Sequence, residues 1–289
     1  MIRAALILLT AFLFASHAAF AKPNGLVVLL GDYGSDDYYA GAVKGTVYSK
    51  YPEARIDAIT LDALPANVRD ASYLLARAAV TFPAGTLFCI LVDTQDAVKS
   101  RALALLAKDG KIYVAPDNGV LTLLLSAEGV EVREIKNPEL LQGDGAASSF
   151  PGRDIYAPAA AALAKGMAFD AVGPVVKDAV QYKVTAPKLE MGELSGEVIH
   201  IDESGNVITN IPQNLVEKLG AVPGKLLSMA IGDETLEAPY VKGFANLRVP
   251  EWLVFINAEG NLEITRSGVN ANAFLQVHDG TVLKIRISR

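Results

Sequence analysis

The chain has 289 residues and a mass of 30.6 kDa, and 51% of its residues are hydrophobic. This composition excludes a disordered or fibrous protein, and the length is enough for one large domain or two medium ones. The net charge is −6 and the pI is near 5.2, without a run of like charges that could line a phosphate backbone. We therefore expect no nucleic-acid partner.

The first residues have the pattern of an export signal. Arg3 gives a short positive region, residues 4–15 are apolar, and Ala19-Phe20-Ala21 places small residues where a signal peptidase reads them. An uncleaved membrane anchor is the alternative, but the apolar run is shorter than the roughly 20 residues that span a bilayer. We expect residues 1–21 to be a signal peptide, a mature protein in the periplasm or secreted, and no membrane association after cleavage.

Cysteine and histidine are scarce. The single cysteine, Cys89, lies in the apolar run 86–92, which favours a buried structural thiol over a nucleophile. The three histidines are His17, His200 and His278, and none has metal-ligand spacing with another histidine or with the cysteine. We expect no metal site.

Residues 22–187 alternate between β-type and helical patterns, which indicates an α/β domain with an open, mainly parallel sheet covered on both faces. The expected strands are Gly25–Leu30, Ile56–Thr60, Thr86–Asp93, Lys111–Pro116 and Val130–Ile135. The expected helices are Tyr38–Lys50, Val68–Thr81, Gly119–Ser126 and Ala157–Lys165.

Residues 188–289 have almost no helical pattern. Their β-type segments predict a small β-barrel or sandwich as a second domain. The expected strands are Leu194–Ile201, Leu226–Ile231, Leu253–Ile256, Asn261–Ile264 and Thr281–Ile287.

Polar clusters directly follow several apolar runs of the first domain, where open α/β sheets bind ligands. Each cluster also has a structural interpretation as a turn, a helix cap or an ion pair. A carboxylate at Asp32, beside glycines, is suited to a ribose diol, whereas Asp36 or Asp37 could cap the next helix. The four clusters are Gly31–Asp37, Asp93–Asp96, Ala115–Gly119 and Phe150–Pro158.

Several motifs in register resemble the S-adenosylmethionine hydroxide adenosyltransferase family, whose relatives include fluorinating and chlorinating enzymes. Gly31-Asp32-Tyr33-Gly34 is similar to the family's Thr-Asp-Phe-Gly, and Ala115-Pro116-Asp117-Asn118-Gly119 matches its Ala-Pro-Asp-Asn-Gly. Asp202-Glu203-Ser204-Gly205-Asn206 and the Thr209-Asn210 pair resemble the Asp-x-Phe-Gly-Asn-x-x-Thr-Asn segment. The resemblance covers essentially the whole mature chain.

The resemblance implies a Rossmann-like domain, a β-barrel domain and a homotrimer with ligand sites between subunits. It implies that Asp32 binds the ribose hydroxyls of an adenosine-containing ligand, while Asp202 and Asn206 hold its methionine or adenine end. The family reaction is a displacement at the ribose C5′ carbon of S-adenosylmethionine, which is the substrate, and no further cofactor is implied.

Hydrolytic family members use an Asp-Arg-His set to prepare water, and this chain keeps only part of that set. Asp93 stands at the position of the aspartate, but Ser100 replaces the arginine and Pro151 replaces the histidine. Arg101, the neighbour of Ser100, is a candidate substitute after a small loop shift. His200 precedes the Asp202 motif, and for it we favour a structural role over a catalytic one.

Three functions remain open at this point. The first is hydrolysis of S-adenosylmethionine with Asp93 and Arg101 as the catalytic candidates. The second is an exported, non-catalytic nucleoside-binding protein. The third is a halogenase. It is the weakest of the three, because the halogenating relatives replace the acid that this chain keeps as Asp93.

Overall fold

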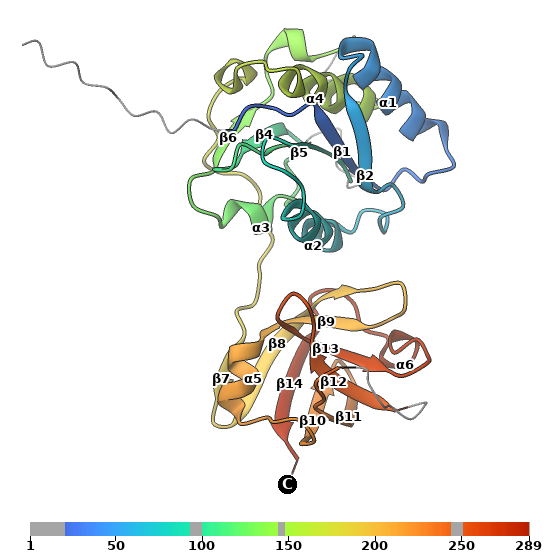
Figure 1. Cartoon of the computed structure of the whole chain (residues 1–289), viewed down its shortest axis with the longest axis vertical. Coiled ribbons are helices and arrows are strands. Elements are labelled where there is room, and N and C mark those ends of the chain that lie inside the picture. Colours follow the sequence, from blue (N-terminus) through green and yellow to red (C-terminus); the bar gives the residue numbers. More distant parts are fainter. Residues whose placement is uncertain (1–20, 93–99, 144–147, 244–250, 289) are drawn as a thin grey trace, which may run out of the picture.

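The computed structural model describes residues 21–92, 100–143, 148–243 and 251–288. The chain forms two bodies joined by the segment that runs from the first sheet to the second (Figure 1). The boundary after residue 187 stays a prediction, and the expected signal peptide lies outside the described residues except for Ala21. Among the described residues, no helix combines the length and apolar character needed to cross a bilayer.

The first body contains a six-stranded sheet in the order β2-β1-β3-β5-β4-β6. Strands β1, β2, β3 and β5 are parallel, and only β4 runs antiparallel to its two neighbours. This confirms the expected open, mainly parallel sheet. The strands are β1 (Leu26–Gly31), β2 (Arg55–Thr60), β3 (Leu87–Leu91), β4 (Ala102–Leu106), β5 (Ile112–Pro116) and β6 (Glu131–Glu134).

Helices cover both faces of this sheet (Figure 1). Helices α1 (Tyr38–Lys50) and α4 (Ala157–Ala164) pack on one face, and α2 (Val68–Ala79) with α3 (Thr122–Leu125) covers the other. Because strand side chains alternate between faces, Val27 and Leu29 join the first core while Val28 and Leu30 join the second. The part of this body that the structure describes also has short helical turns at Pro138–Leu140, Gly152–Tyr156 and Phe169–Val172.

Strand β4 is a strand that the sequence pattern did not indicate. Its sequence, Ala-Leu-Ala-Leu-Leu, consists of residues with high helix propensity. All five residues are buried, and the strand pairs with β5 on one side and β6 on the other. Burial on both faces therefore overrides the local preference.

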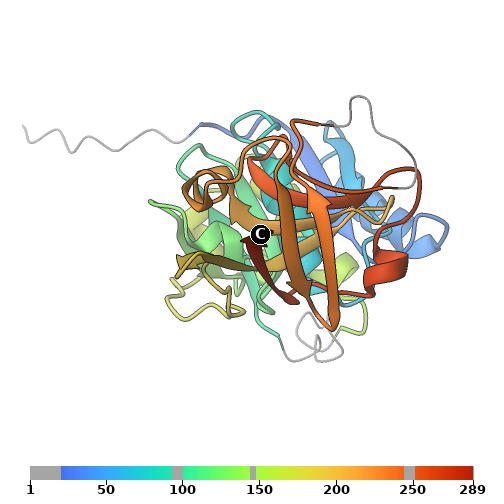
Figure 2. The same ribbon diagram turned by 90° about the horizontal axis from the view of Figure 1, so that it is seen from below.

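The second body is an eight-stranded antiparallel sheet in the order β11-β10-β14-β8-β9-β13-β12, with β7 also paired to β8. A bridge between Tyr240 and Val254 brings its two edges together, so the sheet curls into a nearly closed barrel (Figure 2). This confirms the expected β-barrel. The elements are β7 (Lys188–Glu190), β8 (Glu193–Ile201), β9 (Val207–Pro212), α5 (Gln213–Leu219), β10 (Leu226–Ile231), β11 (Glu234–Pro239), β12 (Trp252–Ile256), β13 (Asn261–Arg266), α6 (Asn272–Leu275) and β14 (Val282–Ile287).

The two bodies meet where the N-terminal part of α2 approaches β8 and the loop before β14. Asn67 Nδ2 donates a 2.6 Å hydrogen bond to Asp279 Oδ2, and Arg69 Nη1 lies 3.4 Å from Glu197 Oε1. Arg69 also donates to the carbonyl oxygen of Lys183 in the connecting segment. Polar contacts therefore hold the second domain against one helix of the first.

Candidate functional site

The carboxyl ends of β1, β3 and β5 lie side by side, because these strands are adjacent and parallel. Asp32 follows β1, and Asp117 and Asn118 follow β5. Asp93, the catalytic candidate after β3, lies outside the described residues. Asn118 Nδ2 donates a 3.1 Å hydrogen bond to Val92 O, so the ends of β3 and β5 are tied together directly before Asp93.

Asp32 lies at the rim of this edge and holds a neighbouring loop. Its Oδ2 accepts a 3.1 Å hydrogen bond from the backbone N–H of Ala66, a residue with a left-handed φ of 55°. Two backbone bonds, Gly34 N to Leu61 O and Ala63 N to Gly31 O, connect the same segments. The Asp32 carboxylate thus has a fixed position, as a ligand-binding group needs.

Aromatic side chains form a wall close to Asp32. Tyr33 and Tyr39 pack against Phe150 with ring centroids 5.8 and 4.9 Å away, and Tyr38 stacks on Tyr39 at 4.3 Å. A Cβ atom on Gly152 would lie 2.7 Å from Tyr33 Oη and 3.2 Å from Phe150 Cε2, so a larger residue there would have to displace these rings. Tyr38 is 66% exposed, which leaves an aromatic surface at the rim.

In two of the polar clusters, Gly31–Asp37 and Phe150–Pro158, charged residues form the helix cap and the ion pair that the structural interpretation predicts. Asp37 is the N-cap of α1, and its carboxylate accepts from the N–H of Tyr38. Arg153 forms a two-pronged ion pair with Asp154 at 2.7 and 2.9 Å, and Ser148 Oγ donates a further hydrogen bond to the same carboxylate at 2.5 Å. The hydrogen bonds from Arg153 hold the pKa of Asp154 below its ordinary value.

Arg101 is held by carboxylates of its own chain. Its Nε lies 2.8 Å from Asp117 Oδ2, and its Nη1 lies 3.0 Å from Asp178 Oδ1. The other oxygen of Asp117 accepts from the N–H of Val180 at 2.7 Å, and the Asp117 side chain is only 4% exposed. The hydrogen bonds to Asp117 and Asp178 raise the pKa of Arg101. Arg101 therefore joins β4 to the connecting segment in this structure.

The two positions that differ from the family pattern lie near the same edge. Ser100 immediately precedes Arg101 and is partly exposed. Pro151 directly precedes the turn Gly152–Tyr156, which has π-helical hydrogen bonding and continues into α4. Proline suits the start of a helix, because the backbone N–H it lacks has no partner within the helix there.

Asp202 and Asn206 form one rigid unit in the turn between β8 and β9. Asn206 donates from its backbone N to Asp202 Oδ1 and from its Nδ2 to Asp202 Oδ2, both at 2.8 Å. Thr265 Oγ1 donates to Asn206 Oδ1. Gly205 has a φ of 79°, and a Cβ there would overlap the side-chain amide of Asn270, so the turn requires glycine.

Two cavities adjoin this unit, and neither includes Asp32. Asp202 lines a cleft of about 620 Å³ between the two domains, together with Asp62, Asp70 and His200. Asn206 lines a more open hollow of about 540 Å³ on the barrel. Asp32 itself lines neither cavity, although its carboxylate binds the N–H of Ala66, which lies between two residues of the Asp202 cleft, Leu64 and Asn67.

His200 contacts the first domain rather than standing free. Its Nδ1 pairs with Asp70 Oδ1 on α2, and its ring stacks on Tyr73 with centroids 4.9 Å apart. The histidine thus has the structural position that we favoured for it. Cys89 is fully buried, and burial raises the pKa of its thiol to about 12, so it is inert as expected. Among the described residues, no group of three or more Asp, Glu, His or Cys side chains is arranged to hold a metal ion.

Sequence reasoning missed a smaller pocket between the domains, lined by residues that include Tyr73, Arg77 and Asn261. These residues come from α2 and β13, which lie far apart in the chain. No motif joins them, and only the docking of the barrel on α2 brings them together.

Comparisons with known proteins cover both domains. Residues 27–173 match the model of the SAM hydroxide adenosyltransferase N-terminal domain, and residues 196–284 match that of its C-terminal domain. An (R)-S-adenosyl-L-methionine hydrolase of Salinispora tropica is 31% identical over 91% of this chain and 98% of its own length. A fluorinase of an Actinoplanes species is 26% identical, covering 86% of this chain and 92% of its own.

Two solved structures share the fold. A conserved protein from Thermotoga maritima superposes with a TM-score of 0.82 at 35% identity, over 90% of this chain and 99% of that one. A conserved protein from Thermus thermophilus gives 0.72 at 25% identity, over 93% and 100%. With both domains matched in order, the chain belongs to the S-adenosylmethionine hydroxide adenosyltransferase family.

Proposed function

We propose that this protein binds S-adenosylmethionine and hydrolyses it to adenosine and L-methionine. Matches over both family domains, and relatives named (R)-S-adenosyl-L-methionine hydrolase, support this assignment. The observation that carries it is the preformed Asp202–Asn206 unit, which is rigid before any ligand arrives. Asp32, fixed at the end of β1, would accept hydrogen bonds from the ribose hydroxyls.

The reaction makes modest demands on the protein. A water oxygen attacks the ribose C5′ carbon, the C5′–S bond breaks, and its electron pair stays on sulfur, so methionine leaves as a neutral thioether. The attacking water releases its proton to solvent or to Asp93. Catalysis then depends mainly on holding water in line with the C5′–S bond and excluding competing water.

A shared site between subunits would bring the separate parts together. Asp32 is not among the residues that line the cleft of Asp202 in one chain. In the proposed homotrimer, the first domain of one subunit would face the barrel of the next. Light scattering on the mature protein should give a trimer mass at micromolar concentration, and a monomer would remove this part of the proposal. Export to the periplasm or beyond is likewise a proposal, based on residues 1–21.

A non-catalytic nucleoside-binding protein is the second candidate. Ser100 and Pro151 replace two members of the hydrolytic set. Arg101, the one nearby cation considered as a substitute, is engaged by Asp117 and Asp178. Halogenation is the weaker third candidate, supported by the fluorinase relatives.

One incubation distinguishes the three candidates. The purified mature protein is mixed with each sulfonium epimer of S-adenosylmethionine in oxygen-18-labelled water, and the products are analysed by chromatography and mass spectrometry. Hydrolysis at C5′ predicts labelled adenosine and unlabelled methionine. A 5′-halo-5′-deoxyadenosine formed with chloride or fluoride would identify a halogenase. Calorimetric binding with both epimers intact would identify a binding protein and overturn hydrolysis.

A matched pair of variants locates the site. Asp32→Ala should weaken ligand binding, whereas Asp36→Ala, which removes an exposed carboxylate of the same loop, should leave binding unchanged. Equal effects of the two substitutions would contradict the role given to Asp32.

A further inference from the structure

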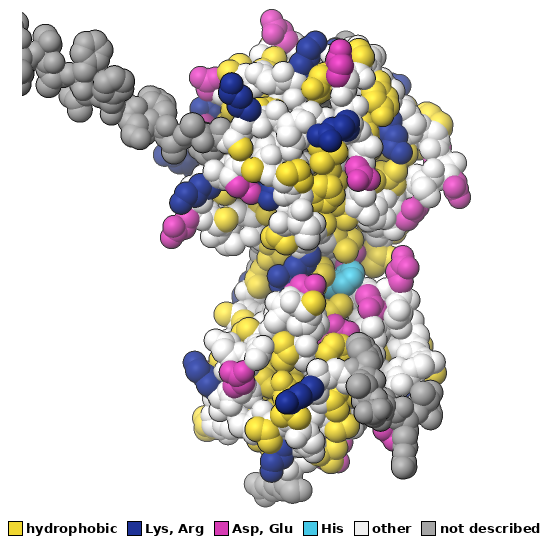
Figure 3. Space-filling view, viewed as in Figure 1, with side chains coloured by type: hydrophobic (Ala, Val, Ile, Leu, Met, Phe, Trp, Pro, Cys, Tyr) yellow, Lys and Arg dark blue, Asp and Glu magenta, His cyan; other side chains and the backbone are white. Residues whose placement is uncertain are grey.

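A small pocket lies at the waist between the two domains, where the molecule narrows (Figure 3). We call it the waist pocket. It has a volume of about 170 Å³ and contains neither Asp32 nor the Asp202–Asn206 unit. Tyr73, Arg77 and Asn261 form one end of it, and its apolar sides include Leu123, Val184 and Ile199.

Asn261 has an unsatisfied polar group at this end. The residue is 8% exposed, and its Nδ2 has no hydrogen-bond partner among the described residues. Its backbone is fixed, because Asn261 N donates to Asn257 Oδ1 and Asn257 N donates to Asn261 O. A buried amide N–H without an acceptor is unfavourable, so the geometry points to an acceptor that is not part of the protein.

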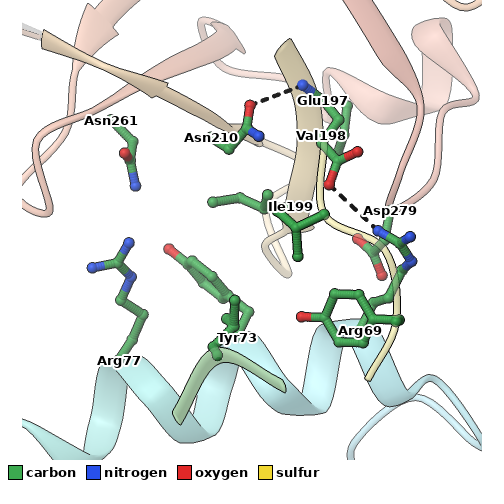
Figure 4. Close-up of a pocket in the computed structure, with 12 residues that line it drawn as sticks. Arg69, Tyr73, Arg77, Glu197, Val198, Ile199, Asn210, Asn261 and Asp279 are labelled. Carbon is green, nitrogen blue, oxygen red and sulfur yellow. Dashed lines mark hydrogen bonds and ion pairs between the residues drawn. The ribbon is translucent and has the colours of Figure 1, made fainter. Parts of the chain in front are cut away.

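Two further donors point into the same space. Figure 4 shows the guanidinium of Arg77 and the hydroxyl of Tyr73 directed toward the side of the pocket where Asn261 lies. Burial raises the pKa of Tyr73, so its hydroxyl stays protonated and able to donate at neutral pH. Among the described residues, Arg77 has no ion pair within 4.0 Å. Its guanidinium lies 5.4 Å from the centroid of the Tyr73 ring and interacts with the Tyr73 hydroxyl, so the two groups form one donor pair. Arg69 at the other end is paired with Glu197.

We propose that the waist pocket binds a small monocarboxylate with an apolar body, with its carboxylate between Arg77 and Asn261. One cation and two neutral donors match a single negative charge on two oxygens. The body would lie against Leu123, Val184 and Ile199. An apolar cavity of about 150 Å³ can bind benzene, so a volume of about 170 Å³ suits a molecule of the size of benzoate.

The shape and lining of the pocket separate this ligand from others. An adenosine-containing molecule would extend beyond the pocket, whose volume is about 170 Å³. Inorganic phosphate would leave the apolar sides uncovered and bring a second negative charge into a pocket that Glu197 and Asp279 also line. A bound monocarboxylate would contact α2 of the first domain and β13 of the barrel, so its binding should also stabilise the docking of the two domains.

Titration of the full mature chain with benzoate, followed by calorimetry and NMR, tests the proposal. We expect saturable binding, and at least tenfold weaker binding of benzamide, which has the same shape without the charge. Arg77→Gln and Asn261→Leu should each weaken benzoate binding about tenfold or more. Arg286→Gln, which removes an exposed arginine on β14, should not change it.

Val184→Trp gives an independent test, because it fills the pocket and keeps every donor. Val184 is 41% exposed, so the larger side chain can be tolerated, and circular dichroism checks the fold. Benzoate binding should be lost. The proposal is overturned by absence of saturable binding, by equal affinity for benzamide, by unchanged binding in Arg77→Gln or Val184→Trp, or by a crystal structure in which Asn261 Oδ1 accepts directly from Arg77 and benzoate is excluded.

Discussion

Replacing Arg101 by glutamine should lower stability rather than remove a catalytic group. The Asp117 side chain is 4% exposed and that of Arg101 is 33% exposed, so their pair is partly buried. Breaking a buried pair costs about 3–5 kcal/mol, and an exposed pair contributes about 0–1 kcal/mol. For this intermediate case we expect a loss of about 2–3 kcal/mol, since the Val180 N–H still partners the carboxylate. The melting temperature should fall by roughly 4–12 °C.

The assay combines calorimetric melting with adenosine release for the parent and for Arg101→Gln, Asp117→Asn and the double variant. If the pair is structural, each single variant should have a lower melting temperature than the parent. The double variant should lose less stability than the sum of the losses in the two single variants. Arg286→Gln is the control for loss of an exposed arginine. Unchanged melting with a turnover reduced a hundredfold or more would refute this reasoning and make Arg101 catalytic.

Three further changes test other parts of the structure. Asp32→Ala should weaken adenosine binding by roughly 1.5–3 kcal/mol for each charged hydrogen bond lost, as measured by calorimetry. If Asp32 served only to hold the N–H of Ala66, the melting temperature would fall and the affinity would not. Pro151→His with Ser100→Arg should raise adenosine release, because general acid–base groups contribute ~10²–10⁴-fold; no gain in a folded, ligand-binding variant would favour the binding-protein function. Burial raises the pKa of Glu263, so the folded state binds a proton that the unfolded state releases, and this contribution to stability is lost as the pH rises through the folded-state pKa. Glu263→Gln should therefore stabilise the protein at pH 8 relative to the parent and lose that advantage toward pH 4; an equal effect at both pH values would contradict the assignment.

The sequence alone was enough for the class of each domain, because local patterns carry that information. Helix α1 begins and ends at the residues expected, Tyr38 and Lys50, and Asp37 caps its first turn. The buried parallel strands have the pattern of short apolar runs between polar turns, and the barrel has that of β-type segments without helical period. Motifs spread from Asp32 to Asn210 also indicated the family that the comparisons show.

Other elements depended on partners that are distant in sequence. Strand β4 has a helix-like composition and is a strand because β5 and β6 pair with it on either side. Strands β9 and β11 were also not predicted. Strand β11, Glu-Thr-Leu-Glu-Ala-Pro, has little β-type character, and it is a strand because it pairs with β10 in the barrel. Strand β9, Val-Ile-Thr-Asn-Ile-Pro, does have β-branched residues and pairs with β8 and β13. Propensity is a weak guide wherever tertiary burial decides the outcome.

For individual polar residues, too, local sequence predicts one part of the role and tertiary contacts decide the other. Residue type and position after a strand predicted that Asp32, Asp117 and Asp202 lie at turns. They did not predict which group each carboxylate contacts. Arg101 looked available beside Ser100, yet folding brings Asp117 and Asp178 against it. The waist pocket depends entirely on the tertiary structure, since Arg77 and Asn261 meet only when the barrel docks on α2. A side chain's chemistry is encoded locally, but whether that chemistry is free to act depends on charges and hydrogen-bond partners that other parts of the chain supply.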